Sequence, residues 1–265
     1  MEGEMVPEQA SFQPYLDSFR KELQAQDPAV IGVVVALLLV ILTAVLMKIF
    51  WASKSTRRAV LLVGLCDSGK TLLFIRLLSG KYKKTQTSIT DTTAIYKTKN
   101  DRRSGLTMID LPGHESLRPQ YVEKFKSSAR AIVFVVDSAV FQKEVRDVAE
   151  FLYSLLTDSV IVKNTPFLLI ACNKQDITMA KSAKLIQQQL EKEMNTLRVT
   201  RSAALSAQDG PSGGGTVHLG KKGKDFEFSQ LPMRVEFVEC SARGSKGEEG
   251  EADIENLEKF LAKLA

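Results

Sequence analysis

Short apolar blocks alternate with amphipathic blocks along most of the chain and predict strands and helices in turn. Apolar runs rich in Val, Ile, Leu and Phe predict strands at residues 59–65, 94–99, 106–110, 130–137, 167–172 and 235–240. Apolar positions at helical spacing predict helices at 70–79, 116–127, 141–157, 179–197 and 253–264. This order predicts an α/β fold with a mostly parallel sheet covered by helices on both faces.

A different pattern occupies residues 29–51. Residues 29–47 read AVIGVVVALLLVILTAVLM and contain no charged side chain. A bilayer core about 30 Å thick needs roughly 20 apolar residues in a helix, so this run predicts one transmembrane helix at 29–51. A cleaved signal peptide has a shorter apolar region after a basic start, whereas the segment before this run is acidic.

Charges on either side of the apolar run predict its orientation. Lys48, Lys54, Arg57 and Arg58 follow it, whereas acidic side chains dominate the residues before it. The positive-inside rule therefore places the C-terminal side in the cytosol and residues 1–28 on the other side of the membrane, with 52–58 as a juxtamembrane linker. Apolar residues recur at helical spacing between positions 12 and 23, which leaves an amphipathic surface helix and a flexible tail both open.

Composition narrows the class of the remaining part. The 265 residues carry a formal net charge of +5, and no run of like charges argues for nucleic-acid binding by itself. Three cysteines are too few and too scattered for a disulfide framework, so reduced thiols are expected, buried for Cys172 and Cys240. Residues 202–230 are rich in Ser, Gly, Ala and Lys and predict a flexible insert before the last strand.

The segment Gly64–Thr71 reads GLCDSGKT and fits a phosphate-binding loop. It follows an apolar strand and opens a helical pattern, which is the context the motif requires. In that context backbone N–H groups point at a phosphate. Lys70 is expected to reach the β- and γ-phosphates, and the Thr71 hydroxyl to hold Mg²⁺.

Further motifs follow the later strands, at the sheet edge where open parallel sheets bind ligands. Asp110 and Gly113 lie in DLPG, where the carboxylate suits Mg²⁺ and the glycine N–H suits a γ-phosphate. Asn173, Lys174 and Asp176 lie in NKQD, where a carboxylate can accept two hydrogen bonds from guanine but not from adenine. The last strand leads into ECSA, whose amides near Ala242 are candidates for the guanine O6.

Together, GLCDSGKT, DLPGH, NKQD and ECSA resemble the small GTPase superfamily, and GHESLRPQY resembles its ADP-ribosylation-factor branch. An anchor directly before such a domain, with TQTSITD and ACNKQD, is similar to the β subunits of the signal recognition particle receptor. The resemblance covers about 59–265, the expected GTPase domain. It implies an endoplasmic reticulum membrane protein that binds GTP or GDP with Mg²⁺. It also implies a heterodimer with the receptor's α subunit and contacts with ribosome and translocon. No sequence-specific nucleic-acid binding is expected.

The resemblance also implies individual roles. Thr90 is favoured as the threonine that completes the Mg²⁺ shell with Thr71 and Asp110, and His114 as the residue that orients the attacking water. Cys66 crowds the place where a partner's arginine finger would approach, and Asp67 brings a carboxylate near the phosphates, so slow intrinsic hydrolysis is expected. The residues expected to contact the nucleotide are Gly64, Leu65, Cys66, Asp67, Ser68, Gly69, Lys70, Thr71, Leu72, Thr85, Gln86, Thr87, Ser88, Gly113, Asn173, Lys174, Asp176, Ser241 and Ala242.

Three functional interpretations share these residues. One is a regulated GTPase switch whose loops are ordered by GTP. Another is an anchored adaptor that uses GTP as a structural cofactor and offers a docking surface. A GTPase of vesicle traffic at the endoplasmic reticulum is the third, and the uncleaved span argues against it, because such proteins leave the membrane on hydrolysis.

Overall fold

The computed structural model describes residues 36–48, 57–97, 105–207, 219–221, 223–244 and 250–264. The chain divides into two compact units, Met1–Thr56 and Arg57–Ala265. In the first unit, residues 36–48 form a helix with exposed apolar side chains. No helix in the described part is both long and apolar enough to cross a membrane. The predicted segments 1–28 and 52–56, and residues 29–35 and 49–51 of the predicted span, lie outside the described residues.

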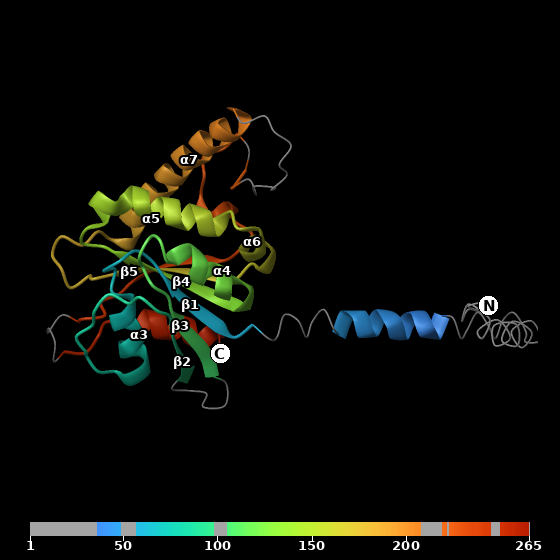
Figure 1. Ribbon diagram of the computed structural model, residues 1–265, viewed down its shortest axis with the longest axis horizontal. Coiled ribbons are helices and arrows are strands. Elements are labelled where there is room, and N and C mark those ends of the chain that lie inside the picture. Colours follow the sequence, from blue (N-terminus) through green and yellow to red (C-terminus); the bar gives the residue numbers. More distant parts are fainter. Residues whose placement is uncertain are drawn as a thin grey trace, which may run out of the picture. The chain divides into compact units, whose positions relative to one another are not determined.

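The second unit is built on a six-stranded sheet with the order β2-β3-β1-β4-β5-β6 (Figure 1). Only the edge strand β2 is antiparallel, to β3, and the other neighbours are parallel. The mostly parallel sheet predicted from the sequence is therefore confirmed. The strands are β1 (Ala59–Val63), β2 (Thr92–Lys97), β3 (Gly105–Asp110), β4 (Ala129–Asp137), β5 (Phe167–Asn173) and β6 (Val235–Glu239).

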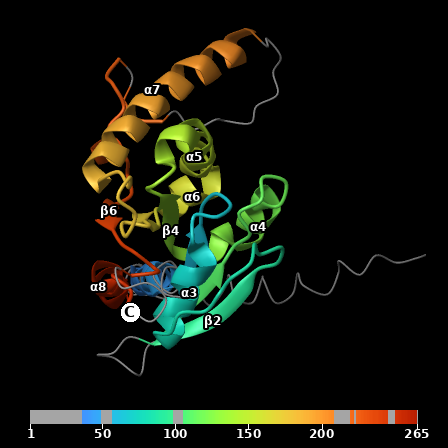
Figure 2. The ribbon, with the colours of Figure 1, turned by 90° about the vertical axis from the view of Figure 1, so that its left-hand side faces the viewer.

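Helices cover both faces of this sheet (Figures 1 and 2). The helices α5 and α7 pack on one face, and α3 and α8 on the other. The helices are α3 (Lys70–Ser79), α4 (Arg118–Phe125), α5 (Phe141–Leu156), α6 (Ser159–Asn164), α7 (Ala183–Ala207) and α8 (Glu255–Leu264), with short 3₁₀ turns η2 (Lys126–Ser128) and η3 (Phe228–Gln230).

Strand β1 lies inside the sheet and is buried on both sides. Leu61 and Val63 belong to the cluster under α5 and α7, whereas Val60 and Leu62 belong to the cluster under α3 and α8. Successive side chains of a strand point to opposite faces, so an uninterrupted apolar run is needed where both faces are covered. Burial of the continuous apolar run at 59–63 therefore fixes where β1 ends and the loop after it begins.

The predicted flexible insert at 202–230 is partly wrong. Helix α7 continues to Ala207 instead of ending at 197, because the Ala- and Leu-containing stretch after 201 has high helix propensity. Farther on, Leu219, Phe226 and Phe228 are buried in the cluster under α7. Arg198 of α7 holds this segment by donating to the carbonyls of Leu219, Lys221 and Lys224. Residues 208–218 and 222 lie outside the described residues.

Helix α6 was not predicted, and several boundaries differ by a few residues. Asp158 caps α6, its Oδ1 accepting from the N–H groups of Val160 at 2.9 Å and Ile161 at 3.0 Å. Asp158 Oδ2 accepts from Lys126 Nζ at 2.8 Å, so the cap residue also ties α6 to η2. The sequence SVIVKN is rich in β-branched residues, which have low helix propensity, so the N-cap signal of Asp158 was overlooked.

The three cysteines are free thiols, as predicted. Cys172 and Cys240 are buried, and Cys66 is half-buried in the loop after β1. Burial, with a smaller contribution from Glu239, raises the pKa of Cys172 to about 12. Burial likewise raises the pKa of Cys240 far above its usual value. Both buried thiols are thus held protonated.

Candidate nucleotide site

The loop between β1 and α3 needs glycine at both ends. Gly64 has φ 147° and Gly69 has φ 89°, in the region that side chains rarely adopt. A Cβ added at Gly64 would lie 2.3 Å from Val135 O, and one at Gly69 would lie 2.4 Å from Asn173 Nδ2. The two glycines let the loop pass directly against β4 and the start of the NKQD segment. Asp67, between them, is also left-handed at φ 55°.

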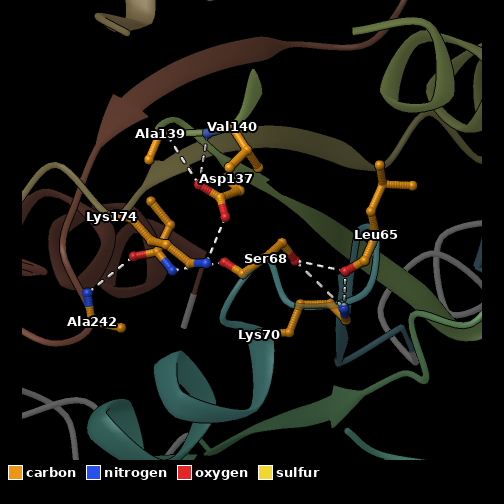
Figure 3. A network of polar contacts seen from close by, with 9 residues as sticks. Leu65, Ser68, Lys70, Asp137, Ala139, Val140, Lys174 and Ala242 are labelled. Carbon is orange, nitrogen blue, oxygen red and sulfur yellow. Dashed lines mark hydrogen bonds and ion pairs between the residues drawn. The ribbon is translucent and has the colours of Figure 1, made fainter. Parts of the chain in front are cut away.

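Lys70 and Ser68 turn inward from this loop. Lys70 Nζ donates to Leu65 O at 2.6 Å, and Ser68 Oγ donates to the same oxygen at 2.9 Å (Figure 3). Lys70 is only 6% exposed. Burial lowers the pKa of Lys70, an effect that the nearby Asp110 carboxylate opposes. The loop therefore places a buried ammonium group at its centre, where a phosphate is expected.

A second corner of the site joins Thr71 to Asp110. Thr71 Oγ1 donates to Asp110 Oδ2 at 2.7 Å and lies 3.0 Å from Ser88 Oγ. The other carboxylate oxygen, Asp110 Oδ1, is buried and has no hydrogen-bond partner in the part of the chain that is described. Burial raises the pKa of Asp110, while the Thr71 hydrogen bond and the Lys70 charge act in the opposite direction.

Thr71 and Asp110 fit a Mg²⁺ site in which phosphates and water supply most of the ligands. A buried carboxylate oxygen without a partner, beside a hydroxyl, supplies the hard oxygen donors that this ion prefers. Within the described ranges there is no group of three or more His, Cys, Asp or Glu side chains that could hold a metal. Mg²⁺ is usually held by one or two carboxylates together with phosphates and water, which agrees with this donor set.

Gly113 comes within contact distance of the phosphate loop. A Cβ added there would lie 2.6 Å from Lys70 Nζ and 2.8 Å from the backbone N of Cys66. Only glycine fits at this approach. The chain after β3 thus passes directly against the phosphate loop and its buried ammonium. A hydrogen bond from the Gly113 N–H to a γ-phosphate stays a prediction.

Asn173 connects the phosphate side of the site to the ECSA loop. Its Nδ2 donates to Ser68 O at 2.8 Å, and its Oδ1 accepts from the N–H of Ala242 at 3.0 Å. Asn173 is 1% exposed, so both bonds are sheltered from water. Because the Ala242 N–H is used by Asn173, it is not free for the guanine O6 that the sequence analysis assigned to amides near Ala242.

Asp176 is held by the ECSA loop as well. Ser241 Oγ donates to Asp176 Oδ1 at 2.6 Å and accepts from the N–H of Gly244 at 2.9 Å. A backbone bridge between Ser241 and Asp253 closes this loop. The carboxylate that is expected to select guanine is therefore directed by Ser241, and within the described residues its second oxygen has no hydrogen-bond partner.

Sequence reasoning missed Asp137, at the end of β4. Asp137 Oδ2 accepts from Lys174 Nζ at 2.5 Å, while Oδ1 accepts from the N–H groups of Ala139 and Val140 (Figure 3). Asp137 is 6% exposed, and Lys174 has φ 67°. The signal was available, because Asp137 ends an apolar strand at the same edge as Asp110. The ion pair fixes where the Lys174 side chain runs.

The phosphate side of the site lines a cleft of about 300 Å³, whereas Asn173, Asp176, Ser241 and Ala242 of the base side do not line it. Its lining contains most of the residues predicted for the phosphate side and also Leu111, which was not predicted. Thr90 is exposed and does not line the cleft, and Ser88 is the residue that contacts Thr71. The lining residues are Cys66, Asp67, Gly69, Lys70, Thr71, Leu72, Thr85, Gln86, Thr87, Ser88, Leu111, Gly113 and Lys174.

A larger cavity of about 780 Å³ lies next to this cleft, between α4 and α5. Cys66 and Gly113 line both spaces. His114 lines the larger cavity and is exposed, and its Nδ1 lies 2.8 Å from Ser116 Oγ. The structure thus places His114 beside the phosphate loop but outside the cleft itself.

Comparison with known proteins identifies the family. The family described as "Signal recognition particle receptor beta subunit" matches residues 55–235. A Mus musculus protein named signal recognition particle receptor subunit beta is 69% identical over 255 residues, 96% of this chain and 94% of the relative. The chain belongs to the signal recognition particle receptor beta subunit family. The Homo sapiens beta subunit is 68% identical over the same shares of both chains.

Solved structures of this family share the fold. A chain of the mammalian SRP receptor has 68% sequence identity and a TM-score of 0.68, covering 78% of this chain and 100% of its own. The beta subunit of Chaetomium thermophilum in its "SRb-GTP/SRX complex" has 22% identity and a TM-score of 0.60, covering 77% and 99%. The fold of the second unit is thus the small-GTPase fold of the beta subunits.

Proposed function

We propose that this chain is the membrane-anchored GTP-binding subunit of a signal recognition particle receptor. It would dock the receptor's α subunit at the endoplasmic reticulum during co-translational targeting. The observation that carries the proposal is Asn173, whose amide joins Ser68 of the phosphate loop to Ala242 of the base loop. Solved structures of the Chaetomium thermophilum receptor are described as SRb-GDP, SRb-GDP-Mg and an SRb-GTP/SRX complex. These descriptions support the proposed ligands and partner.

On the phosphate side, each residue has a proposed task. Lys70 binds the β- and γ-phosphates, and the loop amides from Leu65 to Thr71 bind the remaining phosphate oxygens. Thr71 and Asp110 hold Mg²⁺, which would neutralise charge on the β- and γ-oxygens when bound. Thr90, exposed in this structure, is proposed as the switch residue that joins them when GTP is present.

On the base side, Asp176 is proposed to select guanine by accepting from its N1–H and exocyclic amine. Ser241 already donates to Asp176 Oδ1, so Oδ2 and the remaining lone pair of Oδ1 are proposed to accept from the base. The stem of Lys174, directed by Asp137, would pack on the base.

We propose slow GTP hydrolysis without a partner. His114 lies outside the cleft, and the Cys66 side chain occupies the boundary between the two cavities, where an approaching catalytic group would have to pass. Hydrolysis in minutes or longer in a single-turnover assay would support this. Hydrolysis within seconds by the chain alone would contradict it.

The membrane anchor is proposed from the charge-free run at 29–47 and from the exposed apolar side chains of the helix at 36–48. The basic residues after the run favour a cytosolic GTPase domain. Protease treatment of sealed microsomes tests this topology. A tag at the N-terminus should be protected and one at the C-terminus digested, whereas the reverse pattern would overturn the orientation.

Docking of the α subunit is tested with the full chain in detergent, loaded with GDP or with a non-hydrolysable GTP analogue. Selective capture of the α subunit by the GTP form supports a switch, and equal capture by both forms supports a structural cofactor. Failure to capture it in either state would overturn the partner assignment. Asp176→Asn, loaded in the same way, is the control for guanine-nucleotide dependence.

A further inference from the structure

Arg76 is a buried cation in the last turn of α3, on the side of the sheet away from the larger cavity. It is 4% exposed. Its Nε donates to Ala242 O at 3.0 Å, and its Nη1 donates to Gly80 O at 3.0 Å. Its Nη2 donates to Arg243 O at 3.1 Å and to Gly250 O at 2.9 Å. Four of the five guanidinium N–H groups therefore end on backbone carbonyls.

These carbonyls come from segments that are far apart in the sequence. Gly80 caps the C-terminus of α3, whereas Ala242, Arg243 and Gly250 belong to the ECSA loop and its return. The loop closes at its base through the bridge between Ser241 and Asp253. Arg76 thus joins the helix that begins with Lys70 and Thr71 to the loop that holds Asp176.

Ala242 is fixed from both sides of its backbone. Its N–H donates to Asn173 Oδ1 and its C=O accepts from Arg76 Nε. The preceding residue, Ser241, donates to Asp176. A shift of this loop would therefore move the hydroxyl that directs the Asp176 carboxylate.

Burying Arg76 without a carboxylate partner costs folding free energy, which points to a role other than packing. Moving a cation out of water carries a large penalty, and the four hydrogen bonds of Arg76 end on neutral carbonyls instead of a carboxylate. Carbonyls at the C-terminal end of α3 carry partial negative charge, which offsets part of that penalty. A leucine or methionine at this position would fill the space without binding the loop.

We propose that Arg76 is a positioning residue for guanine recognition, acting through the ECSA loop on Asp176. The inference rests on the proposed function, because it takes Asp176 as the residue that reads the base. Arg76 touches neither the phosphates nor the base in this assignment. It sets the direction of the carboxylate from the far side of the loop.

The test compares GDP with inosine diphosphate, which lacks the exocyclic amine of guanine. In the wild-type full chain, loss of one hydrogen bond to a carboxylate should weaken binding about tenfold or more. Arg76→Gln and Arg76→Lys should lower this preference for GDP, toward none in the Gln variant. The Lys variant should lie between, because it keeps the charge but cannot reach all four carbonyls.

Two reference variants separate positioning from general destabilisation. Leu190→Ala removes a buried side chain on the opposite face of the sheet and should leave the preference unchanged while lowering the melting temperature. Asp176→Asn gives the ratio of GDP to inosine diphosphate affinity that is expected when the base-reading carboxylate is absent. Equal weakening of both nucleotides by the Arg76 variants would overturn the inference. A wild-type chain without preference would instead overturn the proposed guanine site.

A measurement on the wild-type chain covers the case in which the Arg76 variants do not fold. Hydrogen exchange is followed with and without GDP. Binding should slow exchange at residues 241–244 and, through Arg76, at residues 76–80 at the end of α3. Protection of the loop with no change at 76–80 would overturn the inference.

Discussion

Ser241 Oγ donates a hydrogen bond to Asp176 Oδ1 at 2.6 Å and so joins two loops that follow neighbouring parallel strands. The same hydroxyl accepts from the N–H of Gly244. Its single proton is therefore committed to the carboxylate. Asp176 is presented as an acceptor in one direction before any base arrives, which lowers the entropy lost when a ligand binds.

Asp176→Asn should weaken GDP binding about a hundredfold and make xanthosine diphosphate the preferred ligand. The amide donates where the carboxylate accepted, and xanthine offers a carbonyl where guanine has its amine. Loss of two hydrogen bonds to a charged group gives this magnitude. Competition between the two diphosphates measures it. Unchanged preference for GDP would mean that another residue reads the base.

Thr71→Ala should raise the Mg²⁺ concentration needed for slow GDP release by about tenfold to a hundredfold, since it removes an oxygen donor beside the free Asp110 Oδ1. Thr71→Ser keeps the hydroxyl and should behave like wild type. GDP release is followed by fluorescence during a Mg²⁺ titration. Identical titrations for the Ala and Ser variants would remove Thr71 from the metal site.

His114→Ala should slow single-turnover GTP hydrolysis about a hundredfold while leaving GDP affinity unchanged. The resemblance assigns His114 to the attacking water, and because the ring lies outside the cleft in this structure, its loss should leave the ground-state binding site unchanged. His114→Gln should restore part of the rate. Ser116→Ala, which removes the partner of Nδ1, should have a smaller effect. A rate equal to wild type in His114→Ala would exclude this role.

Asp158 should make the stability of the fold depend on acidic pH. Burial raises its pKa, but hydrogen bonds from Lys126 and from the amides of Ile161 and Val160 outweigh burial and leave the pKa lowered. A folded-state pKa below the unfolded value means stability that is present above the unfolded pKa. That stability is lost as pH falls through the folded pKa. Wild type should therefore lose this contribution from about pH 4 downward.

Two variants separate the contributions of Asp158. Asp158→Asn keeps an acceptor for the α6 amides and loses the ion pair, and it should cost about 1 kcal/mol at pH 7. Asp158→Ala loses the cap as well and should cost about 2 kcal/mol. Urea unfolding at pH 7 and pH 3 measures both. Equal losses of stability by wild type and Asp158→Asn between these pH values would contradict the assignment.

The sequence predicted the sheet for a physical reason, and many of the residues that it assigned to the phosphate side line one cleft. Residues 168–172 of β5 are a continuous buried apolar run, and GLCDSGKT requires its glycines whatever surrounds it. Helix α3 was predicted at 70–79 and is observed there, because the loop motif fixes its start and Gly80 its end. These signals are local in the chain.

Features that depend on distant partners were not predicted. Asp137 gains its role only when β4 and β5 bring it against Lys174, and Arg76 only when the ECSA loop folds over α3. Phe226 and Phe228 lie in a stretch whose composition resembled a loop, and their burial depends on α7. Thr90 was favoured by resemblance, yet Ser88 contacts Thr71 in this structure.

Because the three cysteines are buried to different extents, the number of thiols that react with a reagent reports whether the chain is folded. Only the thiolate reacts with maleimides or disulfide reagents, and burial keeps Cys172 and Cys240 protonated and enclosed. Cys66, half-buried in the phosphate loop, is the thiol left accessible. A native molecule should consume one equivalent of reagent and a denatured one three. A dye placed at Cys66 would sit beside the phosphates and report their arrival.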